Sequence, residues 1–94
     1  MNDLFEWNAE KAKTNLKKHG VSFEEATPVF SDSLSLTIPD PLHLADENRF
    51  VISSYSKKQR QLIVIRADRN DKIRIISARL ATPKEKRKYE QETK

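Results

Sequence analysis

The sequence predicts an α+β fold in which helices pack on an antiparallel four-stranded sheet. Residues 9–30 carry apolar side chains at helical spacing, residues 34–78 hold four short apolar runs separated by polar turns, and a helix start follows near residue 82. The expected order is α-α-β-β-β-β-α. Short connections between the strands favour a meander with the helices on one face. The length of 94 residues predicts a single domain over residues 1–94.

Helix-capping patterns justify the two N-terminal helices. Asn8 is a suitable N-cap for a helix to about His19, and Gly20 follows where a C-cap glycine belongs. Ser22-Phe23-Glu24-Glu25 has the spacing of a capping box and opens a second helix. Pro28 lacks a backbone N–H, so this helix should be only about two turns long. Its buried face should hold Phe23, Ala26 and Phe30.

Four strands are expected over residues 34–38, 49–55, 62–65 and 73–78. The unbroken apolar run at 62–65 is typical of a central strand that is buried on both faces. Arg69-Asn70-Asp71 has the chemistry of a tight hairpin turn. Alternation along residues 72–79 places one set of side chains on each face of the sheet. The two expected sets are Arg74, Ile76 and Ala78 against Ile73, Ile75, Ser77 and Arg79.

The last helix begins at a second capping box. Thr82-Pro83-Lys84-Glu85 has the required spacing, with proline at the favoured first helical position. This helix should run to about residue 92, and Tyr89 is its only large apolar residue. The helix is therefore expected either to remain exposed or to dock on another surface, with Tyr89 as its packing anchor.

The composition excludes several classes of site. A single glycine excludes glycine-rich phosphate loops, and the lack of cysteine excludes thiol catalysis and zinc–thiolate cages. The two histidines lie in different predicted elements without clustered carboxylates, so we expect neither a metal nor another cofactor. No apolar run is long enough for a membrane helix, and we expect a cytoplasmic protein.

Charge is distributed unevenly along the chain. Residues 1–56 carry 5 basic and 9 acidic residues, whereas residues 57–88 carry 12 basic and 3 acidic residues. Six of the seven arginines lie in this second segment, and arginine is well suited to bidentate phosphate contacts. A basic surface of this kind predicts binding to nucleic acid, although it is also compatible with a solvated surface.

Metal-independent RNA cleavage fits this inventory of side chains. The RNA supplies its own 2′-OH nucleophile, so the protein needs only to position the strand, neutralise charge and move protons. Arg79 and Arg69 are candidates for stabilising the phosphate, Asp68 for orienting or deprotonating the 2′-OH, and Arg60 for holding the backbone. Further RNA-binding candidates are Arg66, Arg74, Lys57 and Lys58. The residues do not identify the leaving-group acid, for which His19 and Tyr89 are candidates.

Each of these residues also has a structural interpretation. Asp68 could neutralise Arg69 or cap the turn, and Arg79 could simply precede the helix. His19 suits a helix C-terminus, where the dipole favours a cation. Tyr89 is a packing anchor as well as a candidate proton donor.

Two blocks of sequence resemble the BrnT family. The first runs from Phe5-Glu6-Trp7-Asn8 through Lys18-His19-Gly20-Val21 to Val29-Phe30, and the second is Arg74-Ile75-Ile76-Ser77-Ala78-Arg79 with Ala81-Thr82, Glu85 and Tyr89-Glu90. The resemblance covers the chain from about Phe5 to Glu90. Where the family often has an aromatic residue or histidine before Thr-Glu-Arg, this chain has Arg66-Ala67-Asp68-Arg69.

The resemblance implies a function and a partner. It implies a type II toxin with a RelE-like ribonuclease fold that cleaves RNA and arrests translation. The implied partner is a BrnA-like antitoxin with a ribbon-helix-helix domain, in a toxin–antitoxin heterotetramer that reaches operator DNA only through the antitoxin. The competing hypothesis is a non-catalytic basic module that binds nucleic acid or an acidic protein. Asp68 among arginines favours catalysis, because phosphate binding alone needs no carboxylate.

Overall fold

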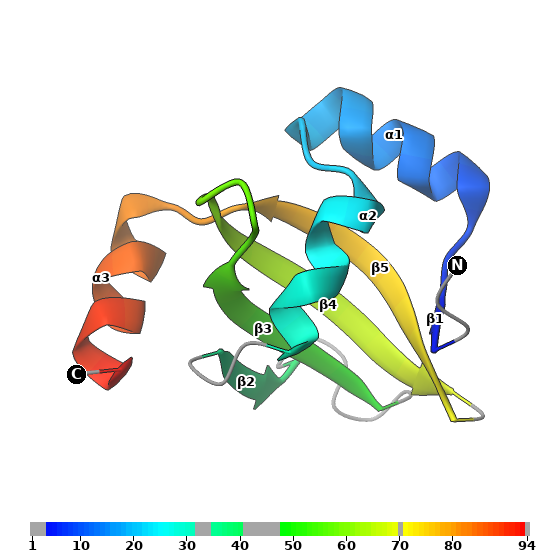
Figure 1. Ribbon diagram of the computed structural model, residues 1–94. Helices are drawn as coiled ribbons and strands as arrows, with labels where there is room; N and C mark the ends of the chain where they lie inside the picture. The colour runs from blue at the N-terminus through cyan, green and yellow to red at the C-terminus, as the bar shows by residue number, and fades with distance from the viewer. Residues whose placement is uncertain (1–3, 32–34, 41–47, 70, 94) are drawn as a thin grey trace.

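The computed structural model describes residues 4–31, 35–40, 48–69 and 71–93. Its centre is a five-stranded sheet in the order β1-β5-β4-β3-β2 (Figure 1). The strands are β1 (Phe5–Glu6), β2 (Leu36–Pro39), β3 (Arg49–Tyr55), β4 (Gln61–Arg69) and β5 (Lys72–Leu80). The helices are α1 (Ala9–His19), α2 (Phe23–Ala26) followed by the 3-10 helix η1 (Thr27–Ser31), and α3 (Pro83–Thr93).

The predicted helix caps are confirmed. The Asn8 side chain accepts from the Lys11 N–H, and Gly20 ends α1 in the left-handed conformation at φ 70°. Ser22 accepts from the Glu25 N–H at the start of α2. Pro28 lies within η1, where its lack of an N–H removes one helix hydrogen bond, and the second helix has 3-10 geometry from Thr27 after one α-helical turn.

The predicted four-stranded antiparallel sheet is wrong in two respects. A fifth strand, β1, pairs with β5, and its pairing is parallel, so the sheet is mixed. This strand contains only two residues, which is too short to show alternation in the sequence. The strand expected from residue 34 begins at Leu36, and residue 34 lies outside the described residues, as does Asn70 of the expected hairpin turn.

A β-bulge changes the predicted faces of β5. Ile65 pairs with Ser77 and Arg66 pairs with Ile75, so Ile76 has no partner in the ladder. The extra residue reverses the alternation at this point. Ile75 and Ala78 consequently share the buried face, which simple alternation had separated.

Different helices cover the two faces of the sheet. On one face, α1, α2 and η1 cover a core of Val21, Phe23, Ala26, Val29, Ile52, Leu62, Val64, Ile75 and Ala78. We call the opposite face the α3 face, because Glu85 and Tyr89 of α3 line a pocket there with Val51 and Ile63. The expectation that all helices share one face is therefore wrong. It failed because local periodicity does not show on which face α3 docks, whereas the contact that anchors this helix, Tyr89 against Tyr55, joins residues far apart in the sequence.

Candidate active site

The predicted catalytic residues lie at opposite ends of β4. Arg60 precedes the strand, and Arg79 pairs with Ile63 near the same end. Asp68 is near the other end, where it pairs with Ile73, and Arg69 is the last residue of the strand. At about 3.3 Å per residue, Ile63 and Asp68 are separated by roughly 16 Å along β4. The structure therefore does not place Arg79 and Asp68 at the same phosphate.

The hairpin end of the sheet is an open, polar hollow. Its lining is Asn48, Arg66, Asp68, Arg69, Asp71, Lys72 and Ile73. The Arg66 guanidinium carbon lies 5.6 Å from the ring centre of Phe30 and 5.0 Å from that of Phe50. An Arg66 nitrogen also lies 3.4 Å from Asp68 Oδ1. Since the Asp68 side chain is 45% exposed, this ion pair is screened by water and holds the carboxylate only weakly.

Arg60 forms a clamp with Glu25. Its Nε donates to Glu25 Oε2 at 2.9 Å, its Nη2 donates to Glu25 Oε1, and Nη2 also donates to the Gly20 carbonyl at 3.0 Å. Ser56 Oγ donates to the same carboxylate at 2.7 Å. These bonds lower the pKa of Glu25, with the Arg60 hydrogen bonds as the largest cause. The clamp joins the end of α1, the start of α2 and the β3–β4 turn.

Arg79 forms a second pair, with Glu85. Its Nη1 and Nη2 donate to Glu85 Oε1 and Oε2 at 2.8 and 2.9 Å, and Nη1 also donates to the Leu80 carbonyl at 3.2 Å. Glu85 additionally accepts from the Thr82 N–H at 2.8 Å, which completes the predicted capping box. Hydrogen bonding to Arg79 is the largest cause that lowers the pKa of Glu85 to about 2.

The two pairs leave different parts of the guanidinium available. In Arg60, the Nε/Nη2 edge is bonded to the carboxylate. In Arg79, Glu85 takes the two terminal nitrogens, and within the described residues no acceptor bonds Nε. A guanidinium carries five N–H groups, so Arg79 retains an Nε/Nη2 edge that can bind a phosphate in bidentate fashion. The Arg79 side chain is 38% exposed.

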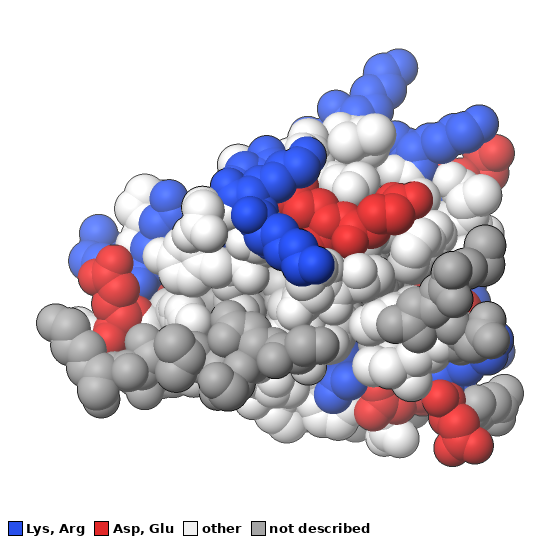
Figure 2. All heavy atoms as spheres, viewed as in Figure 1, with Lys and Arg blue, Asp and Glu red and all other residues white. Residues whose placement is uncertain are grey.

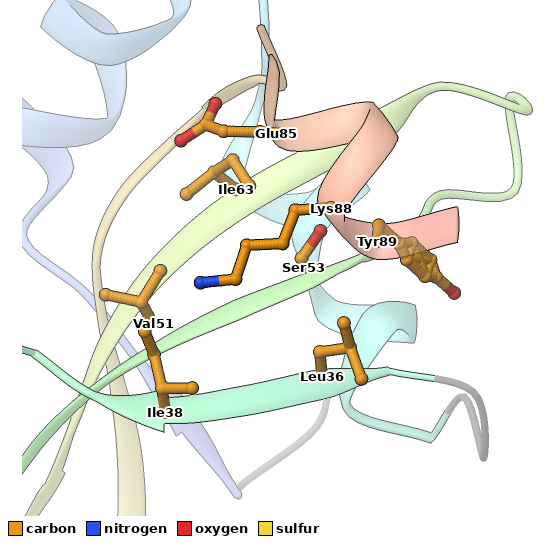
Figure 3. A pocket seen from close by; sticks show the side chains of 8 residues that line it. All are labelled: Leu36, Ile38, Val51, Ser53, Ile63, Glu85, Lys88 and Tyr89. Atoms are coloured by element: carbon orange, nitrogen blue, oxygen red, sulfur yellow. The ribbon is translucent and has the colours of Figure 1, made fainter. Parts of the chain in front are cut away.

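Beside this pair, α3 and the sheet enclose a pocket (Figure 3). Glu85, Lys88 and Tyr89 come from α3, and Lys88 points from the helix into the pocket. Tyr89 is only 5% exposed and packs against Tyr55 with ring centres 5.7 Å apart, which confirms it as the anchor of α3. Its hydroxyl points away from the pocket (Figure 3).

The remaining predicted residues are spread over the surface. Lys57 and Lys58 are exposed at the β3–β4 turn, where basic side chains lie beside the acidic residues of α2 (Figure 2). An Arg74 nitrogen lies 3.8 Å from Glu6, across the β1–β5 pairing. His19 lies at the end of α1, in a hollow that also includes Ser77. The roles predicted for these residues remain predictions.

Two residues beside Arg79 and the pocket, Glu85 and Lys88, have roles that the sequence does not predict. The sequence marks Glu85 as a capping-box residue and as part of the BrnT-like block, but it does not show that Glu85 also fixes Arg79. Lys88 follows Glu85 by one helical turn and precedes the buried Tyr89, and this spacing is the signal that could have placed it at the pocket. Among the described residues, no group of three or more His, Asp or Glu side chains could hold a metal ion. None of the helices in the described part of the chain is long and apolar enough to span a membrane.

Comparison with known proteins decides the family. The family described as the ribonuclease toxin BrnT of a type II toxin–antitoxin system matches residues 7–85. The chain belongs to the BrnT family. It is similar to the crystal structure of the Brucella abortus ribonuclease toxin BrnT, with 26% identity and a TM-score of 0.65 over 81% of this chain and 92% of the Brucella chain. A comparison with curated proteins found no match.

The BrnT match spans both candidate ends of the sheet. It includes the Arg60–Glu25 clamp, the hairpin hollow and the Arg79–Glu85 pair, and it ends at Glu85. The mixed α+β fold with five strands agrees with the likeness to the Brucella BrnT structure. Pocket residues Lys88 and Tyr89 lie beyond the matched segment.

Proposed function

We propose that this BrnT-family chain is the toxin of a type II toxin–antitoxin pair, a metal-independent endoribonuclease that inhibits translation. It would act in the cytoplasm with a RelE-like ribonuclease fold. The observation that carries the proposal at the site is the oriented guanidinium of Arg79. Glu85 holds two of its nitrogens, while the Nε/Nη2 edge is left for a phosphate of the RNA.

The reaction fits the chemistry of the Arg79–Glu85 pair, which lies where β5 leads into α3. When the 2′-OH loses its proton and attacks the adjacent phosphate, negative charge grows on the phosphate oxygens until the P–O5′ bond breaks and the 5′ oxygen leaves as a hydroxyl. A guanidinium that is already fixed in place stabilises this charge without reorganising during the reaction. Lys88 adds a second positive charge beside the pocket. Glu85 is a positioning residue here, because its low pKa makes it a weak proton acceptor.

The other predicted residues would contact the RNA away from the reacting phosphate. Arg69 and Arg66 flank the hairpin hollow, and Lys57 and Lys58 are exposed at the opposite turn. Contacts of this kind contribute to affinity and to its dependence on salt. In this arrangement Asp68 orients the strand at the hairpin end, whereas Arg79 meets the phosphate that is cleaved.

The test is cleavage by the purified protein in EDTA. Wild-type protein should cut RNA and leave a 2′,3′-cyclic phosphate, and Arg79→Ala should lower the rate about 100- to 1,000-fold, the typical cost of removing a preorganised charge-stabilising donor. Activity that is lost with chelator and restored by added metal would disprove metal independence. RNA binding without cleavage would favour the non-catalytic basic module.

We further propose that a BrnA-like ribbon-helix-helix antitoxin neutralises the toxin by covering Arg79. Desolvated charge pairs at such interfaces are coupled by about 1.5–7 kcal/mol. Arg79→Ala should therefore weaken antitoxin binding, whereas Lys17→Ala on the exposed surface of α1 should not. Titration of the antitoxin against both variants measures this. Unchanged affinity and salt dependence for Arg79→Ala would show that the antitoxin docks elsewhere.

A further inference from the structure

The pocket under α3 has an aliphatic floor. Leu36 and Ile38 of β2, Val51 of β3 and Ile63 of β4 form this floor, and α3 supplies the wall (Figure 3). The pocket encloses about 170 Å³. Since an apolar cavity of about 150 Å³ holds one benzene ring, this space suits a single six-membered ring.

Two polar side chains at the pocket, Ser53 and Lys88, can donate hydrogen bonds to a ligand. Ser53 Oγ accepts from Gln61 Nε2 at 3.1 Å, so its O–H is left to donate. The Lys88 ammonium, which points into the pocket, has three donors and no acceptor. The Glu85 carboxylate is already bonded to Arg79 and Thr82. A ring that fits this pocket should therefore carry acceptors such as carbonyl oxygens.

The pocket adjoins the guanidinium that we assign to the phosphate. Glu85 both lines the pocket and holds Arg79, and Arg79 is the cross-strand partner of the floor residue Ile63. An aromatic ring on the pocket floor and a phosphate on the Nε/Nη2 edge of Arg79 would thus lie next to each other. The base and the phosphate of one nucleotide are neighbours in the same way.

We propose that this pocket holds the pyrimidine base of the nucleotide whose 2′-OH attacks, with its 3′-phosphate on Arg79 and its carbonyl oxygen facing Ser53 and Lys88. The proposal rests on the proposed function for the place of the phosphate, and it adds a preference for uracil over adenine. Adenine is a two-ring base that is larger than this space, and its acceptors are ring nitrogens rather than a carbonyl oxygen that projects from the ring toward these donors.

Binding is tested on the whole chain with nucleotides that need no cleavage. Uridine 3′-monophosphate should shift the methyl NMR signals of Val51 and Ile63, and adenosine 3′-monophosphate should shift them far less at equal concentration. Inorganic phosphate should leave these methyl signals in place. Equal shifts with phosphate alone, or no methyl shift with the uridine nucleotide, would overturn the base assignment.

Cleavage is tested with DNA strands that contain a single ribonucleotide, which fixes the attacking 2′-OH. A uridine at this position should be cleaved about tenfold faster than an adenosine. Ser53→Ala should reduce this ratio roughly three- to tenfold, the effect of one hydrogen bond, and Ser53→Thr should restore it. Ser77→Ala removes a hydroxyl that lies outside this pocket and is the matched control.

The two experiments separate this proposal from the proposed function. Cleavage that is equal at uridine and adenosine would overturn the pocket assignment and leave the ribonuclease intact. Selective methyl shifts without any cleavage would support the pocket and contradict the ribonuclease. A uridine preference that persists unchanged in Ser53→Ala would show that another part of the chain reads the base.

Discussion

The Arg60–Glu25 and Arg79–Glu85 pairs have the same chemistry but differ in burial and in what they leave open. Glu25 of the Arg60 pair has a side chain that is 4% exposed, and its carboxylate also accepts from Ser56. In the Arg79 pair both side chains are about one-third exposed, at 38% and 33%. The first pair connects three elements of the fold. The second leaves a guanidinium edge open beside a pocket, and this difference separates a structural arginine from a candidate phosphate-binding one.

Removing Arg60 should have the largest effect on stability. Arg60→Met would leave the buried Glu25 carboxylate without the guanidinium that pairs with it, although the Ser56 hydroxyl would still donate to it, and an unpaired buried charge is strongly destabilising. Urea unfolding measures this loss, with Lys58→Met at the same turn as the exposed control. If Arg60→Met keeps its stability but loses RNA affinity, Arg60 binds the RNA backbone as first predicted from the sequence.

Neutralising Glu85 should have a smaller effect, and mainly on catalysis. Glu85→Gln leaves Arg79 in place but removes the carboxylate that orients it, so we expect cleavage to fall about tenfold, equivalent to about 1.4 kcal/mol. Single-turnover kinetics at saturating protein separates this loss from weaker RNA binding. A wild-type rate would show that Arg79 needs no positioning carboxylate.

Acid should weaken the Arg79 pair over a defined range of pH. The pKa of Glu85 is lowered from 4.5 to about 2 in the folded chain, so protons bind the unfolded chain first as the pH falls. The contribution of this group is complete above about pH 4.5 and is lost toward pH 2. Because both side chains are partly exposed, we expect only about 1 kcal/mol. Stability curves of wild type and Glu85→Gln should converge below pH 3, and parallel curves would contradict this assignment.

The smallest effect is expected at the other end of the sheet. Asp68→Asn should change cleavage less than about threefold, because Asp68 is exposed and lies far along β4 from Arg79. The readout is the cleavage rate of the same RNA. A loss of 100-fold or more would restore Asp68 as the proton acceptor and move the reaction to the hairpin hollow.

Local patterns predicted the parts of the fold that local chemistry controls. Asn8 and Gly20 delimit α1, and Thr82 with Glu85 opens α3, because capping depends on residues within one turn. The unbroken apolar run within β4 marked the centre of the sheet. These elements follow from spacing alone.

Long-range pairings could not be predicted in this way. The parallel partner of β1 is 68 residues away in the sequence, since Phe5 pairs with Ile73. The bulge at Ile76 depends on the register with β4, and it decides which side chains of β5 share a face. The partner of the Arg60 guanidinium, Glu25, lies 35 residues earlier in the sequence, and no local spacing points to it. The arginines were visible in the sequence, but their partners were not.

The most direct test of the open guanidinium edge is the variant Arg79→Lys. It keeps the positive charge but cannot present two N–H groups side by side to a phosphate. In EDTA, under single-turnover conditions and with the folded fraction verified, we predict a cleavage rate about 100-fold below that of wild type. A wild-type rate for Arg79→Lys would contradict the account, because charge alone would then suffice at this position.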